Sequence, residues 1–350
     1  MKKYLFSYRT FGLLLFLLLT ICWTISASKV ELPRRGEFPK LYSNQCEDDL
    51  RKVYLEALDR AEKSIVLIIY SMTDRYILER LQKKAEEGIK VIVVHDHKTK
   101  QYGFNSLGKK IIRYAKKGGG IMHQKILIID EREVYIGSTN LTSSSLRVYD
   151  NLIMGCSSRK LARAILGRHD YLELAPSNSE HEFLIGKQRI EFWSFPEEGK
   201  AGLNYLIDCL DNARSTLKVA MFTWTHPLLT AAVIRAKDRG INVEIVIDRN
   251  QGMGVSKKSV ETLAFAKVPI FFSKSELCHH KMAIIDDSLL ILGSANWTNS
   301  AFTRNNDCFI VIHKLTKKQS DKLKMLWKVV RCTREPIVLS EEKIQLAEAA

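Results

Sequence analysis

The sequence lacks several features that would assign it to a common class of protein. No two of its seven cysteines have Cys-x-x-Cys spacing, which argues against a zinc site and leaves the disulfide state open. It has no recognisable nucleic-acid-binding module and no repeat of aromatic and basic residues. An apolar content of 46% also excludes a disordered or fibrous chain. A length of 350 residues allows two domains or one large one.

Acidic residues are missing from positions 1–28, which form an apolar leader. Basic residues precede an apolar run at 11–25, and small residues follow at 26–28, as in a secretory signal. The run has about 15 residues, fewer than the roughly 20 that span a bilayer. Lys29 and further basic residues follow closely, which disfavours export. Two alternatives remain open: an exported protein, periplasmic or secreted, or a chain anchored to the membrane by residues 1–28.

Negative charge is scarce along the rest of the chain as well. There are 54 lysines and arginines against 39 acidic residues, a net charge of +15. Removing the leader subtracts three basic residues and leaves 15 − 3 = +12. A protein this basic favours polyanionic partners, either an acidic lipid surface or nucleic acid. Charge alone does not choose between them.

The sequence repeats itself. Residues 64–73 resemble residues 216–225 at an offset of 152, and His123 aligns with His279 at an offset of 156. The second copy has therefore gained 156 − 152 = 4 residues, between Asp248 and His279. An internal repeat of this length predicts two similar structural units.

Each copy has the pattern of helix, apolar strand, amphipathic helix and second strand, followed by two strands that look like a hairpin. We therefore predict an α/β fold of two similar repeats, each a mostly parallel central sheet flanked by helices, packed face to face around one active site. The predicted boundaries are a first repeat at 29–175, a linker at 176–188, a second repeat at 189–335 and a charged tail at 336–350.

Both copies carry the same polar motif, His-x-Lys-x₄-Asp followed by Gly-Ser-x-Asn. On an extended chain, residues two apart face the same side, so the histidine and lysine project together, as do the serine and asparagine. One His-x-Lys motif would carry little weight, but two copies with the same Lys-to-Asp and Asp-to-Gly spacing make coincidence improbable. The candidate site residues are His123, Lys125, Asp130, Ser138 and Asn140 in the first copy and His279, Lys281, Asp286, Ser294 and Asn296 in the second.

This set of side chains suits a phosphodiester. Lysine, serine and asparagine can bind the non-bridging oxygens, while imidazole can attack phosphorus or transfer a proton. Two copies facing each other supply a nucleophile on one side of the phosphorus and a proton donor on the other. The fixed cations neutralise the phosphate, so we expect neither a metal nor another cofactor. We expect Asp130 and Asp286 to be structural, fixing a hairpin turn or pairing with a basic side chain.

The paired motif resembles the phospholipase D superfamily over nearly the whole chain after the leader. The chain is similar to a tandem fusion of its small members, the cardiolipin hydrolases and periplasmic endonucleases, which implies a monomeric pseudo-dimer. The resemblance implies a phosphohistidine on His123 and a general acid at His279, although the repeat symmetry leaves the reverse open. It also implies an acid that orients an imidazole. Asp307 fits in the second copy; in the first, either Asp150 reaches by a one-residue slip or Asn151 replaces it as a neutral acceptor.

The expected activity is hydrolysis of a phospholipid, similar to phosphatidylcholine or cardiolipin, to phosphatidic acid. The apolar leader and the lack of a nucleic-acid-binding module favour a phospholipid or membrane surface as partner. A metal-independent endonuclease and a cardiolipin synthase-type phosphatidyl transferase are the alternative enzymes. A catalytically inactive module that binds nucleic acid or lipid is the alternative from a different class.

Overall fold

The computed structural model describes residues 11, 30–98, 102–169, 172–176, 178–274, 277–331 and 337. Residues from Pro33 onward form one compact unit, distinct from residues 1–32. The predicted leader at 1–28 lies outside the described residues except for Phe11, and the predicted tail at 336–350 lies outside them except for Ile337. In the described part of the chain, no helix is long and apolar enough to cross a membrane.

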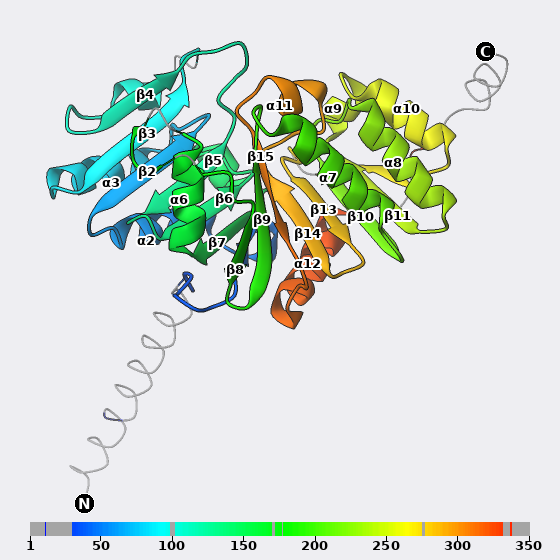
Figure 1. Ribbon diagram of the computed structural model, residues 1–350, viewed down its shortest axis with the longest axis horizontal. Helices are drawn as coiled ribbons and strands as arrows, with labels where there is room; N and C mark the ends of the chain where they lie inside the picture. Colours follow the sequence, from blue (N-terminus) through cyan, green and yellow to red (C-terminus); the bar gives the residue numbers. More distant parts are fainter. Residues whose placement is uncertain are drawn as a thin grey trace, which may run out of the picture. The chain divides into compact units, whose positions relative to one another are not determined.

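The first repeat is built on a 7-stranded sheet with the strand order β1-β7-β6-β5-β2-β3-β4 (Figure 1). Its strands are β1 (Lys40–Tyr42), β2 (Ser64–Ile69), β3 (Lys90–Asp96), β4 (Ile112–Lys116), β5 (Lys125–Ile129), β6 (Glu133–Gly137) and β7 (Ile153–Ser157). Its helices are η1 (Asn44–Cys46), α2 (Leu50–Asp59), α3 (Arg75–Glu86), α4 (Tyr102–Asn105), α5 (Ser143–Arg147) and α6 (Arg159–Gly167).

The second repeat is built on an 8-stranded sheet with the order β12-β11-β10-β13-β14-β15-β9-β8. Its strands are β8 (Glu182–Ile185), β9 (Gln188–Ser194), β10 (Thr216–Met221), β11 (Asn242–Ile247), β12 (Ile270–Phe272), β13 (Lys281–Ile285), β14 (Leu289–Gly293) and β15 (Cys308–Ile312). Its helices are α7 (Gly199–Asp211), α8 (Pro227–Asp238), α9 (Arg249–Met253), α10 (Lys257–Phe265), α11 (Asn299–Thr303) and α12 (Lys317–Val330). Strand β8 lies inside the predicted linker at 176–188 and pairs with β9.

The two-repeat α/β architecture is confirmed, but the prediction of mostly parallel sheets is wrong. In each repeat only three strands are parallel, β2-β3-β4 and β10-β11-β12. The other neighbouring pairs are antiparallel, including β5 with β6 and β13 with β14. The turns after Ile129 and Ile285 are only a few residues long, and so short a connection can join only antiparallel neighbours. Both sheets are therefore mixed.

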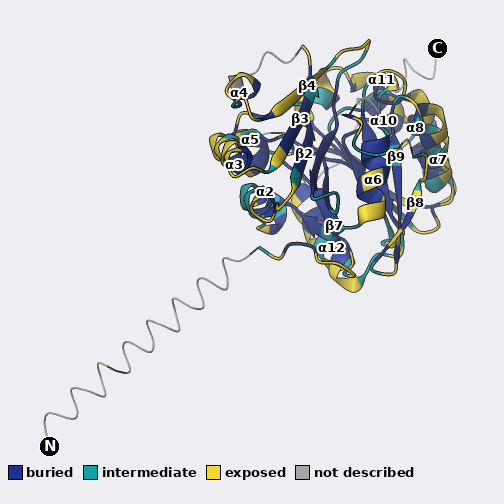
Figure 2. Ribbon diagram, turned by 60° about the vertical axis from the view of Figure 1, so that its left-hand side comes forward, coloured by how far each residue is buried: buried dark blue, intermediate teal, exposed yellow. Residues whose placement is uncertain are grey.

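The two sheets share one hydrophobic core. Buried side chains from both sheets, such as Ile128 and Ile284, belong to the same cluster as Leu161 and Ile165 of α6 and Trp327 of α12. Helix α6 is amphipathic: most of its residues are buried in this core, whereas its basic residues at 159, 160 and 163 are exposed. Figure 2 shows most strands buried, with β4 largely exposed, whereas the outer helices α2, α3, α7 and α8 each expose one side. One core for both repeats fixes the two motifs relative to each other.

The sheet registers bring the two motifs to corresponding places. Lys125, at the start of β5, pairs with Ile69 at the end of β2, and Lys281 pairs in the same way with Met221 of β10. The motifs therefore lie at the edge where the parallel strands end, which is where ligands bind in open α/β sheets. We call this the catalytic edge.

Candidate active site

The His123 side chain is completed by the other repeat. Its Nδ1 atom lies 2.8 Å from Oδ1 of Asp307, and its backbone N–H donates to the carbonyl oxygen of Asn306 at 2.8 Å. Both the imidazole and the carboxylate are shielded from water, since His123 and Asp307 are buried. A carboxylate on Nδ1 holds the proton there, so Nε2 is left with its lone pair facing away from Asp307.

The His279 side chain has the reciprocal arrangement with a different acceptor. Its Nδ1 lies 3.0 Å from the side-chain oxygen of Asn151 in the first repeat. The amide group of Asn151 is oriented by its own donors, because Nδ2 donates to the carbonyl oxygen of Ser145 at 2.8 Å. Of the two alternatives from the sequence, Asn151 is therefore the residue that meets the imidazole. The Asp150 carboxylate instead accepts a hydrogen bond from Nε2 of Gln45.

Both motif lysines are buried beside the imidazole of their own repeat. Nζ of Lys125 donates to the carbonyl oxygen of His123, and Nζ of Lys281 donates to that of His279 at 2.8 Å. Each ammonium also lies over an aromatic ring, Lys125 at 5.4 Å from the centroid of Tyr70. The equivalent ring in the second repeat is Phe222. These contacts hold the two Nζ groups in place beside the imidazoles.

The motif serines differ from the prediction that they bind phosphate directly. Oγ of Ser138 donates to Oδ1 of Asn151 at 2.8 Å, and Oγ of Ser294 donates to Oδ1 of Asp307 at 2.7 Å. Both serines are fully buried. Each hydroxyl proton thus orients Asn151 or Asp307, the residue that in turn contacts an imidazole. The serines are one residue removed from the expected position of a substrate.

The motif asparagines remain candidates for phosphate binding. Asn140 and Asn296 are half-buried, each two residues beyond the serine of its motif. The side-chain oxygen of Asn296 accepts a hydrogen bond from the backbone N–H of Thr223 at 3.3 Å, so its NH₂ group is free to point elsewhere. An amide NH₂ held in this way is a suitable donor to a non-bridging oxygen.

The motif aspartates lie at the far end of the hairpin strands from the imidazoles. The Asp130 carboxylate accepts hydrogen bonds from the backbone N–H groups of residues 62–64, and Asp286 does the same with residues 214–216. Both have a positive φ, 52° and 53°, a conformation that aspartate tolerates better than most residues. They fix the loop that precedes β2 or β10, so they belong to the fold and not to the catalytic group.

A second pair of aspartates, which the sequence analysis did not assign to the site, positions the imidazoles. Oδ2 of Asp96 accepts a hydrogen bond from the backbone N–H of Met122 at 2.7 Å, and Oδ2 of Asp248 accepts one from Cys278 at 3.1 Å. Each acceptor thus holds the residue directly before a motif histidine. The signal was present in the sequence, because these two aspartates align at the same offset of 152 as the strands at whose ends they lie.

The site gathers four basic groups and one carboxylate in a buried place. Burial and the neighbouring lysines hold the pKa of His279 well below its usual value of 6.5. Burial also lowers the pKa of His123, although Asp307 opposes this, and it lowers that of Lys125 to about 7. The pKa of Lys281 falls well below its usual range through burial and the charge of Lys125. Burial acts to raise the pKa of Asp307, but His123 and Lys125 outweigh it and the pKa is lowered.

Two lysines and two imidazoles around one carboxylate make a site suited to an anion. A bound phosphodiester would supply the negative charge that the lysines and imidazoles lack, and would favour their protonated forms. In the described part of the chain, no group of three histidine, cysteine or acidic side chains could hold a metal ion. His95 and Asp96 form the end of β3, and Asp96 is used to position Met122.

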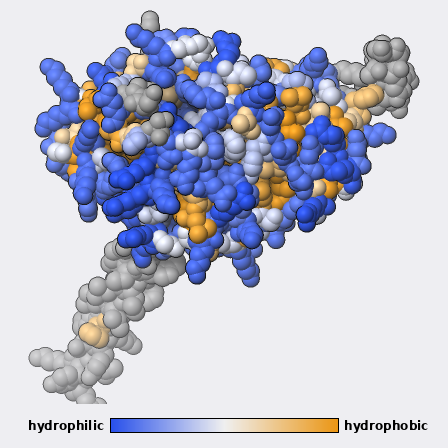
Figure 3. All heavy atoms as spheres, in the orientation of Figure 1, coloured by the Kyte–Doolittle hydropathy of each residue, from blue (hydrophilic) through white to orange (hydrophobic). Residues whose placement is uncertain are grey.

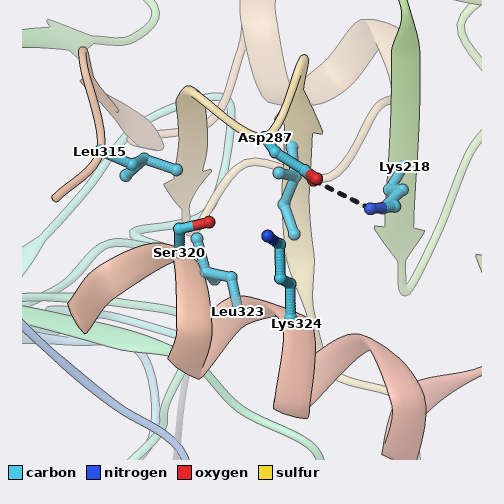
Figure 4. A pocket seen from close by; sticks show the side chains of 7 residues that line it. Lys218, Asp287, Leu315, Ser320, Leu323 and Lys324 are labelled. Carbon is cyan, nitrogen blue, oxygen red and sulfur yellow. Dashed lines mark hydrogen bonds and ion pairs between the residues drawn. The ribbon is translucent and has the colours of Figure 1, made fainter. Parts of the chain in front are cut away.

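A small pocket lies away from these groups, beside α12 (Figure 4). Its lining includes Lys324 and Ser320 of α12 and the ion pair between Lys218 and Asp287, whose Nζ and Oδ1 atoms are 2.9 Å apart. Asp287 follows the end of β13, whereas Lys281 begins that strand. The pocket therefore belongs to the edge opposite the catalytic edge.

The two-repeat fold and the paired His-x-Lys site are those expected for the phospholipase D superfamily. The sequence profile described as "Cardiolipin synthase, PLD-like domain" matches residues 54–169 and 206–327, one match in each repeat. The chain belongs to this family of phospholipase D-like proteins.

Similar proteins agree with this assignment. The chain is 31% identical over 128 residues to a mitochondrial cardiolipin hydrolase from Chlamydomonas reinhardtii, covering 36% of this chain and 57% of that protein. It is 33% identical over 109 residues to a phospholipase D from Rickettsia bellii, covering 31% of this chain and 54% of that protein. Each match thus spans little more than half of the relative.

A solved structure covers almost the whole chain. The phosphatidylserine synthase of Haemophilus influenzae superposes with a TM-score of 0.67 at 13% sequence identity, covering 91% of this chain and 93% of that one. At this identity the likeness concerns the fold alone. It places both repeats of this chain in a single known two-repeat architecture.

Proposed function

We propose that this protein is a phospholipase D-type hydrolase that cleaves a membrane phospholipid, similar to cardiolipin or phosphatidylcholine, to phosphatidic acid. The relatives described above are named as a cardiolipin hydrolase and a phospholipase D, which supports a lipid phosphodiester as substrate. The net charge of +15 and the basic groups gathered at the site support an anionic reacting group.

In the proposed first step, Nε2 of His123 attacks the phosphorus atom. A nitrogen–phosphorus bond forms as the bond between phosphorus and the leaving alcohol oxygen breaks, and His279 gives its proton to that oxygen. Lys125, Lys281 and the two motif asparagines stabilise the charge on the non-bridging oxygens. Binding of the anion raises the proton affinity of His279, which enables a residue with so low a pKa in the free protein to act as an acid.

In the second step, neutral His279 takes a proton from water. The water oxygen bonds to phosphorus, the nitrogen–phosphorus bond breaks and His123 is restored. The products are phosphatidic acid and the free head-group alcohol. An alcohol that replaces water in this step would give transfer in place of hydrolysis.

One observation carries the assignment of roles: His123 meets a carboxylate and His279 meets a neutral amide. A phosphorylated imidazole carries a positive charge, and the Asp307 carboxylate stabilises that charge. Asn151 orients His279 without a negative charge, so His279 can release its proton more readily. These differences favour His123 as the nucleophile and His279 as the acid, then base.

The test supplies the purified protein with labelled phosphatidylcholine and cardiolipin vesicles, with and without ethanol, beside single-stranded nucleic acid. We expect phosphatidic acid without ethanol and some phosphatidylethanol with it. With a phosphorus-labelled p-nitrophenyl diester, whose leaving group needs no acid, alkali-stable label on His123 should accumulate when His279 is replaced by alanine. Cleaved nucleic acid beside intact lipid would support the endonuclease alternative. Inertness towards all these diesters and a p-nitrophenyl phosphodiester would favour the inactive binding module.

A further inference from the structure

The connection between α9 and α10 presents apolar side chains to water. Met253 is 53% exposed and Val255 is 62% exposed, with only Gly254 between them. A third exposed apolar residue, Val148, is 46% exposed in the first repeat. It lies two residues before Asp150, whose backbone N–H donates to the carbonyl oxygen of Leu277 at 3.0 Å. These exposed apolar residues thus occur in segments that lead directly into the site.

The α9–α10 connection is held in shape by the residues around it. Oγ1 of Thr223 donates to Oε1 of Gln251 at 3.1 Å, and Oγ of Ser256 accepts from the backbone N–H of Trp224 at 3.0 Å. Ser256 itself is fully buried. The backbone on both sides of Met253 and Val255 is therefore anchored, and the exposure of their side chains is a property of the folded loop.

Basic residues flank the two apolar side chains. Arg249, Lys257 and Lys258 are exposed, and residues 249–260 contain no acidic side chain. The second copy gained its four extra residues between Asp248 and His279, the interval that contains this connection. A symmetric site would not require these four extra residues in the second repeat.

The connection lies at the catalytic edge. Helix α9, which leads into it, begins directly after Asp248, the residue that holds Cys278 beside His279. In Figure 1 this edge is uppermost and carries α9, α11 and the chain that links β4 to β5. We call Met253, Val255, Lys257 and Lys258 the docking rim.

We propose that the docking rim binds the surface of an anionic phospholipid bilayer, with Met253 and Val255 entering the boundary between head groups and acyl chains. This inference rests on the proposed lipid substrate and adds how the bilayer is presented to the site. Aliphatic side chains gain free energy when they leave water for that boundary, and lysines are attracted to anionic head groups. The imidazoles are buried, so a rim that enters the interface brings a lipid phosphate within their reach.

Single-stranded nucleic acid fits this rim less well. Proteins that bind it stack bases on aromatic side chains. Exposed methionine and valine gain no favourable contact with a charged phosphate backbone. The docking rim contains no aromatic residue. The bilayer is therefore the partner that uses both the apolar and the basic residues.

Helix α12 offers a matched control with the same residue types. Met325 and Val329 are each 45% exposed, and Lys324 and Lys328 are exposed beside them. Figure 4 shows Lys324 beside the Lys218–Asp287 ion pair, at the edge opposite the catalytic edge. Figure 3 shows that hydrophilic residues cover most of one face and that hydrophobic residues gather in small patches. Exposed apolar residues therefore occur in several places, and the docking rim is distinguished by its position at the catalytic edge.

The first test compares the full-length M253S/V255S variant with the M325S/V329S control. On vesicles of phosphatidylcholine with cardiolipin, we expect the rim variant to lose about tenfold in initial rate and the control to lose none. On monomeric dibutyroyl phosphatidylcholine, both should match the parent protein, which shows that the site is intact. K257S/K258S should lose about tenfold only when cardiolipin is present. Equal rates of the rim variant and the control on vesicles would overturn the inference.

A second readout does not depend on catalysis. A polarity-sensitive fluorophore is attached at Met253→Cys or at Met325→Cys, with Cys22, Cys209 and Cys332 replaced by serine. We expect a blue shift and quenching by brominated acyl chains at position 253 only. If neither form of lipid is cleaved, the proposed function fails, while this shift still supports docking. A label at 253 that stays in water with vesicles, or responds to single-stranded DNA in their place, would contradict docking.

Discussion

Nδ1 of His123 in the first repeat lies 2.8 Å from a carboxylate oxygen of Asp307 in the second repeat. The reciprocal contact joins His279 of the second repeat to Asn151 of the first. Each imidazole is therefore oriented by the repeat to which it does not belong. Neither repeat contains a complete site, and the two form one reaction centre.

A single shared site predicts that either histidine is indispensable. His123→Ala and His279→Ala should each lower kcat for a soluble phosphodiester by at least on the order of 10³-fold, because one supplies the nucleophile and the other the proton. His181→Ala, which changes a ring stacked on Trp193 away from the site, should keep the rate of the parent protein. Steady-state kinetics measure all three. Half of the parent activity in either of the first two variants would indicate independent sites.

Replacing Asn151 by aspartate and replacing Asp307 by asparagine should shift different limbs of the pH profile of kcat/KM. His279 must be protonated to act as an acid, so the rate falls as pH rises through its pKa, which burial and Lys281 hold well below 6.5. Asn151→Asp adds a charge that favours the protonated form, so the alkaline limb of kcat/KM should move to higher pH.

Asp307→Asn should act on the other limb. His123 must be neutral to attack, so the rate rises with pH through its pKa, and Asp307 raises that pKa against the effect of burial. Without the carboxylate, the acid limb should move to lower pH, and the maximal rate should fall by on the order of 10²-fold or more. If Asn151→Asp moved the acid limb in place of the alkaline limb, the roles of the two histidines would be reversed.

The repeat, the motifs and the shared site could be predicted from the sequence, because equal spacing in two copies is a local property. The contact between His123 and Asp307 could not, since it joins residues 184 positions apart in different repeats. It depends on the packing of two sheets on one core. The partners of Ser138 and Ser294 could not be predicted for a related reason: strand alternation gives the face of a side chain but not the partner that it meets there.

The mixed character of the sheets was also hidden in the sequence. All five residues of β5 and of β13 are buried, so neither strand alternates between apolar and polar residues. Continuous apolar runs of this kind are typical of parallel strands buried on both faces. Here the second face is covered by the other repeat and by α6, so antiparallel strands acquire the same pattern.

Asp286→Asn should affect stability and leave the chemistry intact. The carboxylate accepts hydrogen bonds from three backbone N–H groups, and although burial opposes it, these bonds lower the pKa of Asp286 below its usual 3.8. Because the folded pKa is the lower one, the stabilisation is present above about pH 4 and is lost as pH falls through the folded pKa. We expect a loss of about 1–3 kcal/mol at pH 7 in urea unfolding.

The neighbouring variant Asp287→Asn is the control for that measurement. It removes an ion pair with Lys218 that is partly exposed to solvent, and should cost less than about 1 kcal/mol. Asp286→Asn should keep kcat within about twofold at a temperature where it is folded. A large loss of kcat in the folded variant would return Asp286 to the catalytic group.

Chelation should leave the rate unchanged, because the proposed mechanism neutralises the phosphate with Lys125, Lys281, Asn140 and Asn296. The measurement is hydrolysis of a soluble diester after dialysis against millimolar EDTA. Loss of activity that zinc or magnesium restores would require a metal in the reaction and would contradict the proposed mechanism.

An inorganic dianion should stabilise the protein through Lys125, and more so at low pH. Burial lowers the pKa of Lys125 to about 7, so its positive charge is fully present below that pH and is lost as pH rises above it. Sulfate keeps its charge of −2 over this range, so its affinity should fall between pH 6 and pH 8.5 as the site loses protons. At a hundred times its dissociation constant it should add about 2.7 kcal/mol to the free energy of unfolding at pH 6, measured by calorimetry. Lys125→Gln should lose most of this gain, whereas Lys84→Gln, which changes a buried lysine bonded to the carbonyl oxygens of Asp59 and Ala61, should keep it. An equal gain in both variants would mean that sulfate acts only as a general stabilising salt.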